Sequence, residues 1–216
     1  MKTIRSSGGG TLPPERSIGR SKYGKQTTIF PSRKNGSLII CETRLEADAC
    51  FRWEQDRNVI AYREQPERLH LVVNGKAHTY VPDFVVEYAD RPIRFIEVKP
   101  DNVLQKPKYL DLYWAAKQHL ESRGAEFELL TERQIRRQPF LNNLIRTYNQ
   151  SRGVLPLELD FLRDQLSALN PPLRIRELLA LPSPPSPGAI AAAIFNQDLR
   201  LDWSKPVTQD SRVDWR

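Results

Sequence analysis

Three side chains in the middle of the chain have the types and the spacing of a metal-binding hydrolytic site. Asp83 follows Pro82 on one predicted strand, and Glu97 and Lys99 lie two residues apart on the next predicted strand. Side chains on a strand alternate between its two faces, so Glu97 and Lys99 point in the same direction. A short turn joins the two strands, and we therefore expect Asp83 to lie close to Glu97.

Two carboxylates on neighbouring strands offer the oxygen ligands that Mg²⁺ prefers, with Mn²⁺ as a substitute. A lysine beside such an ion can orient a water molecule and offset the charge that develops on a phosphoryl group. The alternative is that Asp83 and Glu97 only pair with Arg91 and Arg94. We favour a reactive site, because Glu97-Val98-Lys99 is the only acid-x-Lys triplet in the chain and ends a predicted strand.

A third carboxylate comes from a predicted amphipathic helix at about residues 42–56, where apolar residues recur near helical spacing. A helix packed beside the sheet can direct Glu46 toward the other two acids. Glu42 lies one turn earlier and is an alternative, and a solvated helix face is the simplest interpretation of both. The predicted catalytic set is Glu46, Asp83, Glu97 and Lys99, with the three acids as metal ligands.

The elements that position these residues follow an α+β pattern. Asn74-Gly75 between two apolar runs is a strong hairpin signal. Predicted strands cover residues 69–73, 78–88, 93–98 and 127–130, and predicted helices cover residues 42–56, 107–123 and 139–149. A helix, a β-meander and then helix, strand, helix indicate an α/β (α+β) domain with a mixed sheet flanked by helices.

The last third of the chain has a different character. Residues 150–154 resemble a linker, and helices are predicted at 155–168, 174–181 and 188–196, before a hairpin or wing between 199 and 213. Three helices and a hairpin are the order of a small winged-helix module. We therefore expect three segments, which are a basic N-terminal arm at 1–36, a catalytic domain at 37–150 and a winged-helix-like domain at 151–216.

The net charge of +7 lies entirely in residues 1–40, which contain eight Lys or Arg and one acid, while residues 41–216 contain 25 of each sign. A basic arm beside a neutral body is suited to hold a nucleic-acid backbone, and a solvated tail is the alternative. The cations expected to contact DNA are Lys22, Lys25, Arg33, Lys34 and Arg44. The chain has no apolar run of membrane-spanning length and no secretory leader pattern, which predicts a cytoplasmic protein.

Residues 41–46, 64–66, 80–84 and 96–99 together resemble the TnsA endonuclease family. The resemblance covers about residues 30–150 and continues loosely into 155–216. It implies a restriction-endonuclease-like fold of the PD-(D/E)XK type. It also implies that Glu46 is the helix glutamate, Asp83 the metal-binding aspartate, Glu97 the second metal-ligand position and Lys99 the catalytic lysine of that family.

The same resemblance implies a Mg²⁺-dependent DNA endonuclease subunit of a heteromeric transposase, which cuts the 5′ ends of a transposon. The implied partners are double-stranded DNA at the transposon ends, a TnsB-type transposase and a TnsC-type AAA+ ATPase, in a bacterial, nucleoid-associated setting. Two alternatives stay open. One is a stand-alone restriction, repair or phage nuclease, and the other is a DNA-binding scaffold subunit with a degenerate site.

Overall fold

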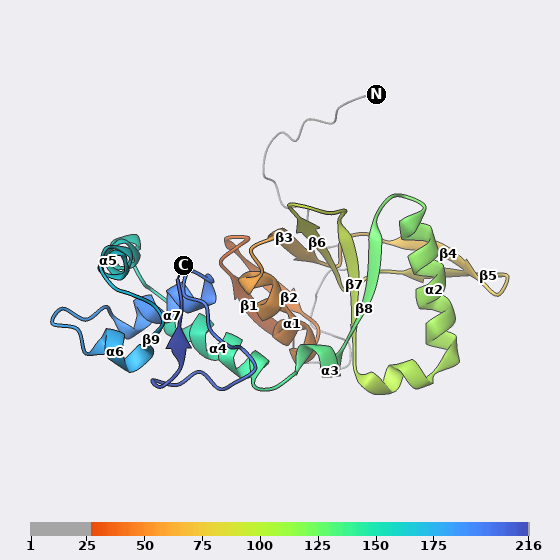
Figure 1. The fold of residues 1–216 in the computed structure, drawn as a ribbon. Coiled ribbons are helices and arrows are strands. Elements are labelled where there is room, and N and C mark those ends of the chain that lie inside the picture. The colour runs from red at the N-terminus through yellow and green to blue at the C-terminus, as the bar shows by residue number, and fades with distance from the viewer. Residues whose placement is uncertain (1–26, 216) are drawn as a thin grey trace, which may run out of the picture.

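A computed structural model describes residues 27–215 as an elongated molecule, β-rich at one end and helical toward the C-terminus (Figure 1). The central sheet has the strand order β3-β6-β7-β8. Strands β3, β6 and β7 pair antiparallel, whereas β7 and β8 pair parallel, so the predicted mixed sheet is confirmed. These strands are β3 (Val59–Glu64), β6 (Phe84–Tyr88), β7 (Arg94–Lys99) and β8 (Glu126–Thr131).

Helices cover both faces of this sheet, as predicted. Helix α1 (Arg44–Gln55) packs on one face, where Ile96 and Val98 of β7 join a core with Trp53. Helix α2 (Pro107–Glu121) packs on the other face, where Phe95 joins a core with Tyr113. The alternation of side chains along β7 therefore directs Glu97 and Lys99 to the α2 side of the sheet. A short 3₁₀ helix, η1 (Asp101–Gln105), connects β7 to α2.

The strand predicted at 78–88 is wrong as a single element. Residues 76–80 form β5 (Lys76–Tyr80), which pairs with β4 (Leu69–Val73), whereas β6 belongs to the central sheet. Proline has no N–H to donate to a strand ladder, and Pro82 lies in the break between the two strands. The predicted hairpin turn is confirmed, because Asn74 and Gly75 both have positive φ angles, 51° and 74°.

The predicted arm at 1–36 also needs correction. Residues 28–36 are not a loop but form β1 (Thr28–Ser32) and a turn, and β1 pairs with β2 (Ser37–Cys41). The boundary expected after residue 36 therefore falls inside a hairpin. Phe30 and Ile39 on its inner face are 3% exposed and pack into the core under α1, which explains why this basic segment is ordered. Residues 1–26 lie outside the described part of the chain.

The C-terminal third builds a second core from Leu162, Leu178, Ile194, Leu199 and Val213. All predicted helices are present within a few residues, but the predicted hairpin is different. Strand β10 pairs with β9, and Arg200 and Asp214 form only an isolated bridge. The elements that follow β8 are α3 (Glu132–Ile135), α4 (Phe140–Gln150), α5 (Pro156–Ser167), β9 (Leu173–Arg174), α6 (Ile175–Leu179), α7 (Pro187–Phe195) and β10 (Arg212–Val213).

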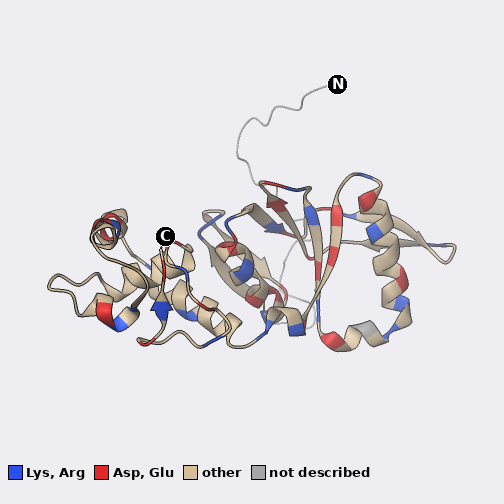
Figure 2. Cartoon of the chain, viewed as in Figure 1, with Lys and Arg blue, Asp and Glu red and all other residues tan. Residues whose placement is uncertain are grey.

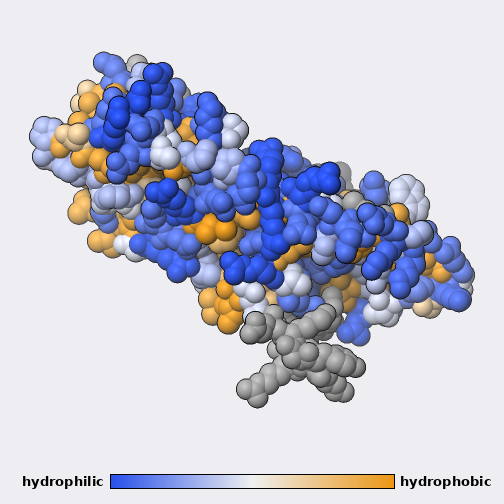
Figure 3. All heavy atoms as spheres, turned by 90° about the horizontal axis from the view of Figure 1, so that it is seen from below, coloured by the Kyte–Doolittle hydropathy of each residue, from blue (hydrophilic) through white to orange (hydrophobic). Residues whose placement is uncertain are grey.

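The surface seen from below is mainly hydrophilic, with scattered apolar patches (Figure 3). Within residues 27–215, no helix is long and apolar enough to cross a bilayer.

Candidate active site

A cavity of about 520 Å³ opens where the start of α1, the β5–β6 connection, the end of β7 and the start of α2 meet. It is lined by all four residues of the predicted catalytic set. The other lining residues are Glu42, Thr43, Leu45, Arg68, Thr79, Tyr80, Val81, Val98, Pro100, Tyr109, Leu112 and Tyr113.

Lys99 bridges the two sheet carboxylates at this cavity. Its Nζ lies 3.1 Å from Oδ2 of Asp83 and 2.7 Å from Oε1 of Glu97. The backbone N–H of Val98 also donates to Oδ2 of Asp83, at 2.8 Å, and fixes this carboxylate against the end of β7. Asp83 and Glu97 therefore lie on the same side of the sheet and within reach of one cation.

Glu97 is 4% exposed, and both of its oxygens have donors. The hydroxyl of Tyr80 donates to Oε2 at 2.6 Å, while Lys99 holds Oε1. Burial and then the negative charge of Asp83 raise the pKa of Glu97 to about 7, against the lowering effect of Lys99 and Tyr80. The pKa of Lys99 is raised: burial opposes its charge, but the two carboxylates outweigh that effect.

Glu46 comes to the cavity through the local structure of the α1 N-terminus. Thr43 caps the helix by accepting from the N–H of Glu46, and the Glu46 carboxylate accepts from the Thr43 hydroxyl and from the N–H of Glu42. This capping arrangement fixes the side chain at 7% exposure. Burial and then the negative charge of Asp83 raise the pKa of Glu46 to about 7, so the Glu46 and Asp83 carboxylates are close enough to repel each other.

Gln65 and Tyr80 support the site but were not among the predicted site residues. Gln65 is 3% exposed and has a positive φ of 44°. Its N–H donates to the carbonyl of Asp83 at 2.8 Å, and its Nε2 donates to Oε1 of Glu42 at 2.7 Å. Its Oε1 is buried without a hydrogen-bond partner among the described residues. Gln65 thus ties the Asp83 segment to the start of α1.

The sequence signal for Gln65 is its place in Glu64-Gln65-Pro66, one of the segments that resemble the TnsA family, and a residue just before a proline is also typical of a turn. The signal for Tyr80 was weaker, because only its position three residues before Asp83 set it apart.

The donor set at the cavity is chemically suited to a hard divalent cation. Asp83 and Glu97 each present an oxygen to the same point, now held by the Lys99 ammonium, and carboxylate oxygens are preferred ligands of Mg²⁺ and Mn²⁺. Across residues 27–215, no three His, Cys, Asp or Glu side chains are gathered tightly enough to form a preassembled metal site. The pair therefore fits two ligand positions, and Mg²⁺ commonly keeps water in the others.

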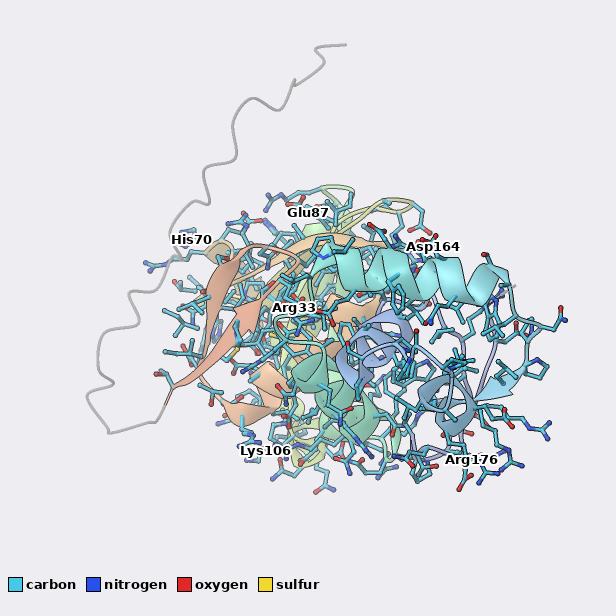
Figure 4. The ribbon with its side chains drawn as sticks, turned by 90° about the vertical axis from the view of Figure 1, so that its left-hand side faces the viewer. Arg33, His70, Glu87, Lys106, Asp164 and Arg176 are labelled. Atoms are coloured by element: carbon cyan, nitrogen blue, oxygen red, sulfur yellow. The ribbon has the colours of Figure 1, made fainter. Side chains whose placement is uncertain are left out.

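The predicted DNA contacts lie in different places. Lys22 and Lys25 are outside the described residues. The guanidinium of Arg33 donates to the carbonyl of Tyr148 and the hydroxyl of Ser151, and lies 4.1 Å from the centre of the Tyr148 ring. Arg33 is still exposed overall, and Figure 4 labels it near the middle of that view.

Lys34 is also used inside the fold, since its Nζ donates to the carbonyls of Asp56 and Val59. Arg44 differs, because its side chain is 79% exposed beside the cavity residue Thr43, with only a 3.9 Å contact to Asp48. The structure thus supplies structural roles for Arg33 and Lys34, and DNA contact by these two cations stays a prediction.

Comparison with known proteins agrees with this geometry. Residues 56–132 match the family model described as TnsA-like endonuclease N terminal. The matched segment contains Asp83, Glu97 and Lys99, whereas Glu46 precedes it. No curated protein matches the chain. Residues 56–132 are therefore similar to the N-terminal domain of TnsA-like endonucleases.

Proposed function

We propose that this protein is a Mg²⁺-dependent DNA endonuclease, with Asp83, Glu97 and Lys99 at its reactive centre and Glu46 as the third acid. The observation that carries the proposal is the shared contact of Asp83 and Glu97 with the Lys99 ammonium, inside a cavity of an endonuclease-family domain. A merely structural ion pair would not need a third buried acid, Glu46, on the same cavity.

The chain's own residues have distinct roles in this proposal. Asp83 and Glu97 hold the divalent cation, with Glu46 completing the acidic surface around it. A bound divalent ion would supply Lewis-acid chemistry at the phosphodiester and would activate a water molecule. Lys99 lies beside these carboxylates and can offset the charge that develops on the phosphate. Tyr80 keeps the Glu97 carboxylate in one orientation, and Gln65 keeps the Asp83 segment beside α1.

In biological terms, we propose that the enzyme cuts the 5′ ends of a transposon in the bacterial nucleoid, as a subunit of a heteromeric transposase. A TnsB-type transposase and a TnsC-type AAA+ ATPase are the proposed partners. The support is the similarity of residues 56–132 to TnsA-like endonucleases, since the resemblance to that family implies a role at transposon ends.

We also propose that residues 151–216 are a winged-helix-like domain beside a catalytic domain that ends near residue 150. The support is the element order α5-β9-α6-α7-β10, in which β10 returns to pair with β9. Helix α7 occupies the position of a recognition helix, but residues 189–195 are all buried against α4, α5 and the second core. This module therefore does not present α7 to DNA bases, and a partner-binding role suits it better.

A plasmid-nicking assay with Mg²⁺ or Mn²⁺, on a plasmid that carries transposon ends and with the partner transposase present, tests the catalytic assignment. We expect Asp83→Ala and Lys99→Ala each to lower the nicking rate by about 100-fold or more, because one removes a proposed metal ligand and the other removes the cation proposed to contact the phosphate. Asp90→Ala, an exposed turn residue paired with Arg91, is the matched control and should retain activity. Full activity in both cavity variants would refute the assignment.

Activity of the purified protein alone separates the transposase role from a stand-alone nuclease. We expect little cutting of linear DNA by this chain alone, and cutting at transposon 5′ ends once the partner transposase is added. Vigorous partner-free cutting favours the restriction or repair alternative. Failure to bind Mn²⁺ by calorimetry favours a scaffold with a degenerate site.

A further inference from the structure

Exposed cations surround the mouth of the acidic cavity. Arg68 lines it just before β4, and Lys106 and Lys108 flank Pro107 at the start of α2. The ammonium nitrogens of Lys106 and Lys108 lie 6.0 and 5.0 Å from the centre of the Tyr109 ring. Because Tyr109 itself lines the cavity, one aromatic ring holds two flexible cations at its rim.

The three rim cations have no acidic partner among the described residues, unlike several other cations of this half of the molecule. Arg94 pairs with Glu126 and Glu128, and Arg123 pairs with Glu67. Arg68, Lys106 and Lys108 form no ion pair with any residue in the range 27–215. Figure 2 shows this basic start of α2 at the end of the molecule away from the C-terminal helices.

The acids close to them in the sequence have other partners. Glu67, beside Arg68, pairs with Arg123. Asp111, three residues after Lys108, accepts from Nδ2 of Asn74 at 3.0 Å. Asp101, in η1, accepts from the backbone N–H of Arg133 at 3.2 Å and lies 3.9 Å from its guanidinium. In Figure 4, Lys106 lies near the lower edge of the molecule, apart from the more central Arg33. The positive charge of Arg68, Lys106 and Lys108 is therefore not neutralised by an ion pair within residues 27–215, and it can attract an anionic ligand.

The arrangement of charge indicates which ligand. The cavity holds Glu46, Asp83 and Glu97, which repel a small anion, whereas a DNA backbone that crosses the mouth also places neighbouring phosphates against the rim. Lysine and arginine contacts to phosphates dominate DNA affinity and fix the register of the duplex. An acidic protein segment would gain from the rim but would have no phosphodiester to present to Lys99.

We propose that Arg68, which lines the cavity, and Lys106 and Lys108, which lie over Tyr109, bind backbone phosphates of duplex DNA beside the bond that is cut. This inference rests on the proposed endonuclease function and names its DNA-contact surface. It moves that surface from the β1–β2 turn, where Arg33 and Lys34 were expected to act, to the rim of the cavity.

The test is the salt dependence of DNA binding by the full chain, measured by fluorescence anisotropy in EDTA. Each lost phosphate contact lowers the log–log salt slope by about 0.9, so Lys106→Gln/Lys108→Gln should lower it by about 2 and weaken binding at least tenfold. Arg68→Gln should lower the slope by about 1. Lys76→Gln/Arg152→Gln removes the same charge from exposed sites away from the cavity and should change affinity less than about twofold.

Tyr109→Leu adds a second measurement that does not remove charge. It should weaken binding by only about two- to fivefold, because the lysines remain but lose the ring that holds them. Equal slopes for wild type and Lys106→Gln/Lys108→Gln would overturn the proposal, as would an equal loss in the Lys76/Arg152 variant. Since EDTA removes the cleavage step, a protein that binds through the rim but never cuts DNA would refute the endonuclease function and leave this surface intact.

Discussion

The Lys99 ammonium lies 2.7 Å from Oε1 of Glu97, in the position where a cation that bridges Glu97 and Asp83 would also lie. The lysine therefore compensates the charge of the buried Glu97 and the half-buried Asp83. A divalent ion held by the same two carboxylates would compete with Lys99 for them, and Lys99 would then be available to a phosphate. Binding of a metal ion and the position of the Lys99 ammonium are thus coupled, because both involve the carboxylates of Asp83 and Glu97.

This coupling predicts opposite effects of one substitution on binding and on catalysis. Lys99→Met should bind Mn²⁺ at least about tenfold more tightly than wild type, because a cation a few ångströms from the site no longer repels the ion. The same variant should lose nearly all nicking activity. Calorimetry in the absence of DNA measures the first effect. Lys117→Met, which removes a lysine paired with Glu121 on α2, is the control, and a loss of Mn²⁺ affinity in Lys99→Met would contradict the prediction.

Glu46 gives a prediction about stability and pH. Its pKa is raised from 4.5 to about 7, so the folded protein keeps a proton that the unfolded chain releases in this window. The contribution of Glu46 to the free energy of unfolding therefore falls as the pH rises from about 4.5 to 7, and it is constant above pH 7. Glu46→Gln does not titrate and retains the cap, so it should exceed wild type by up to about 3 kcal/mol at pH 8 and by little at pH 4.5.

Urea unfolding in EDTA at a series of pH values measures this difference. Glu158→Gln is the matched control, because Glu158 occupies the same N-terminal capping position in α5 but is less buried than Glu46 and has a lowered pKa. A stability gap between Glu46→Gln and wild type that does not widen with pH would show that Glu46 is not held protonated.

Tyr80 predicts a shift in the pH dependence of metal binding. Its hydroxyl donates to Oε2 of Glu97 and lowers the pKa of that acid, so Tyr80→Phe should raise the pKa further. A proton must leave before a metal binds, and Mn²⁺ affinity at pH 7 should therefore fall by about tenfold and largely recover at pH 9. Tyr62→Phe, which removes a hydroxyl bonded to Glu54 outside the cavity, should leave the profile unchanged. An equal loss at both pH values would indicate general damage instead.

The sequence pattern predicted the positions of Asp83, Glu97 and Lys99, because these depend on residues that are close together in the chain. Glu97 and Lys99 share a face through the two-residue period of a strand, and a short turn returns the chain from Asp83 to them. The same kind of pattern located α1, α2 and the Asn74-Gly75 turn. Helix and strand periodicity are properties of short windows, so one sequence is enough to recognise them.

The contacts that the sequence pattern did not predict come from packing between segments that are far apart in the chain. Tyr80 reaches Glu97 from β5, which pairs with β4 outside the central sheet, and Gln65 reaches Glu42 from the end of β3. Arg33 and Lys34 have the composition of a DNA-binding arm, yet the β1–β2 turn places their charges on carbonyl oxygens. A charge run specifies no partner, and only the folded chain shows which cations are already used.

We therefore predict that substitution of Arg33 lowers the stability of the fold and leaves DNA binding unchanged. Arg33→Ala loses two hydrogen bonds and the stacking on Tyr148, and it should lower the free energy of unfolding by about 1–3 kcal/mol. The salt slope of DNA binding should stay at the wild-type value, because this guanidinium is already bonded to Tyr148 and Ser151. Arg44→Ala is the matched variant with the reverse pattern: its side chain is 79% exposed, so stability should change by less than about 0.5 kcal/mol. Its salt slope should fall by about 1 if Arg44 touches a phosphate. A fall in slope for Arg33→Ala at temperatures where the variant is folded would restore Arg33 to the DNA-binding surface.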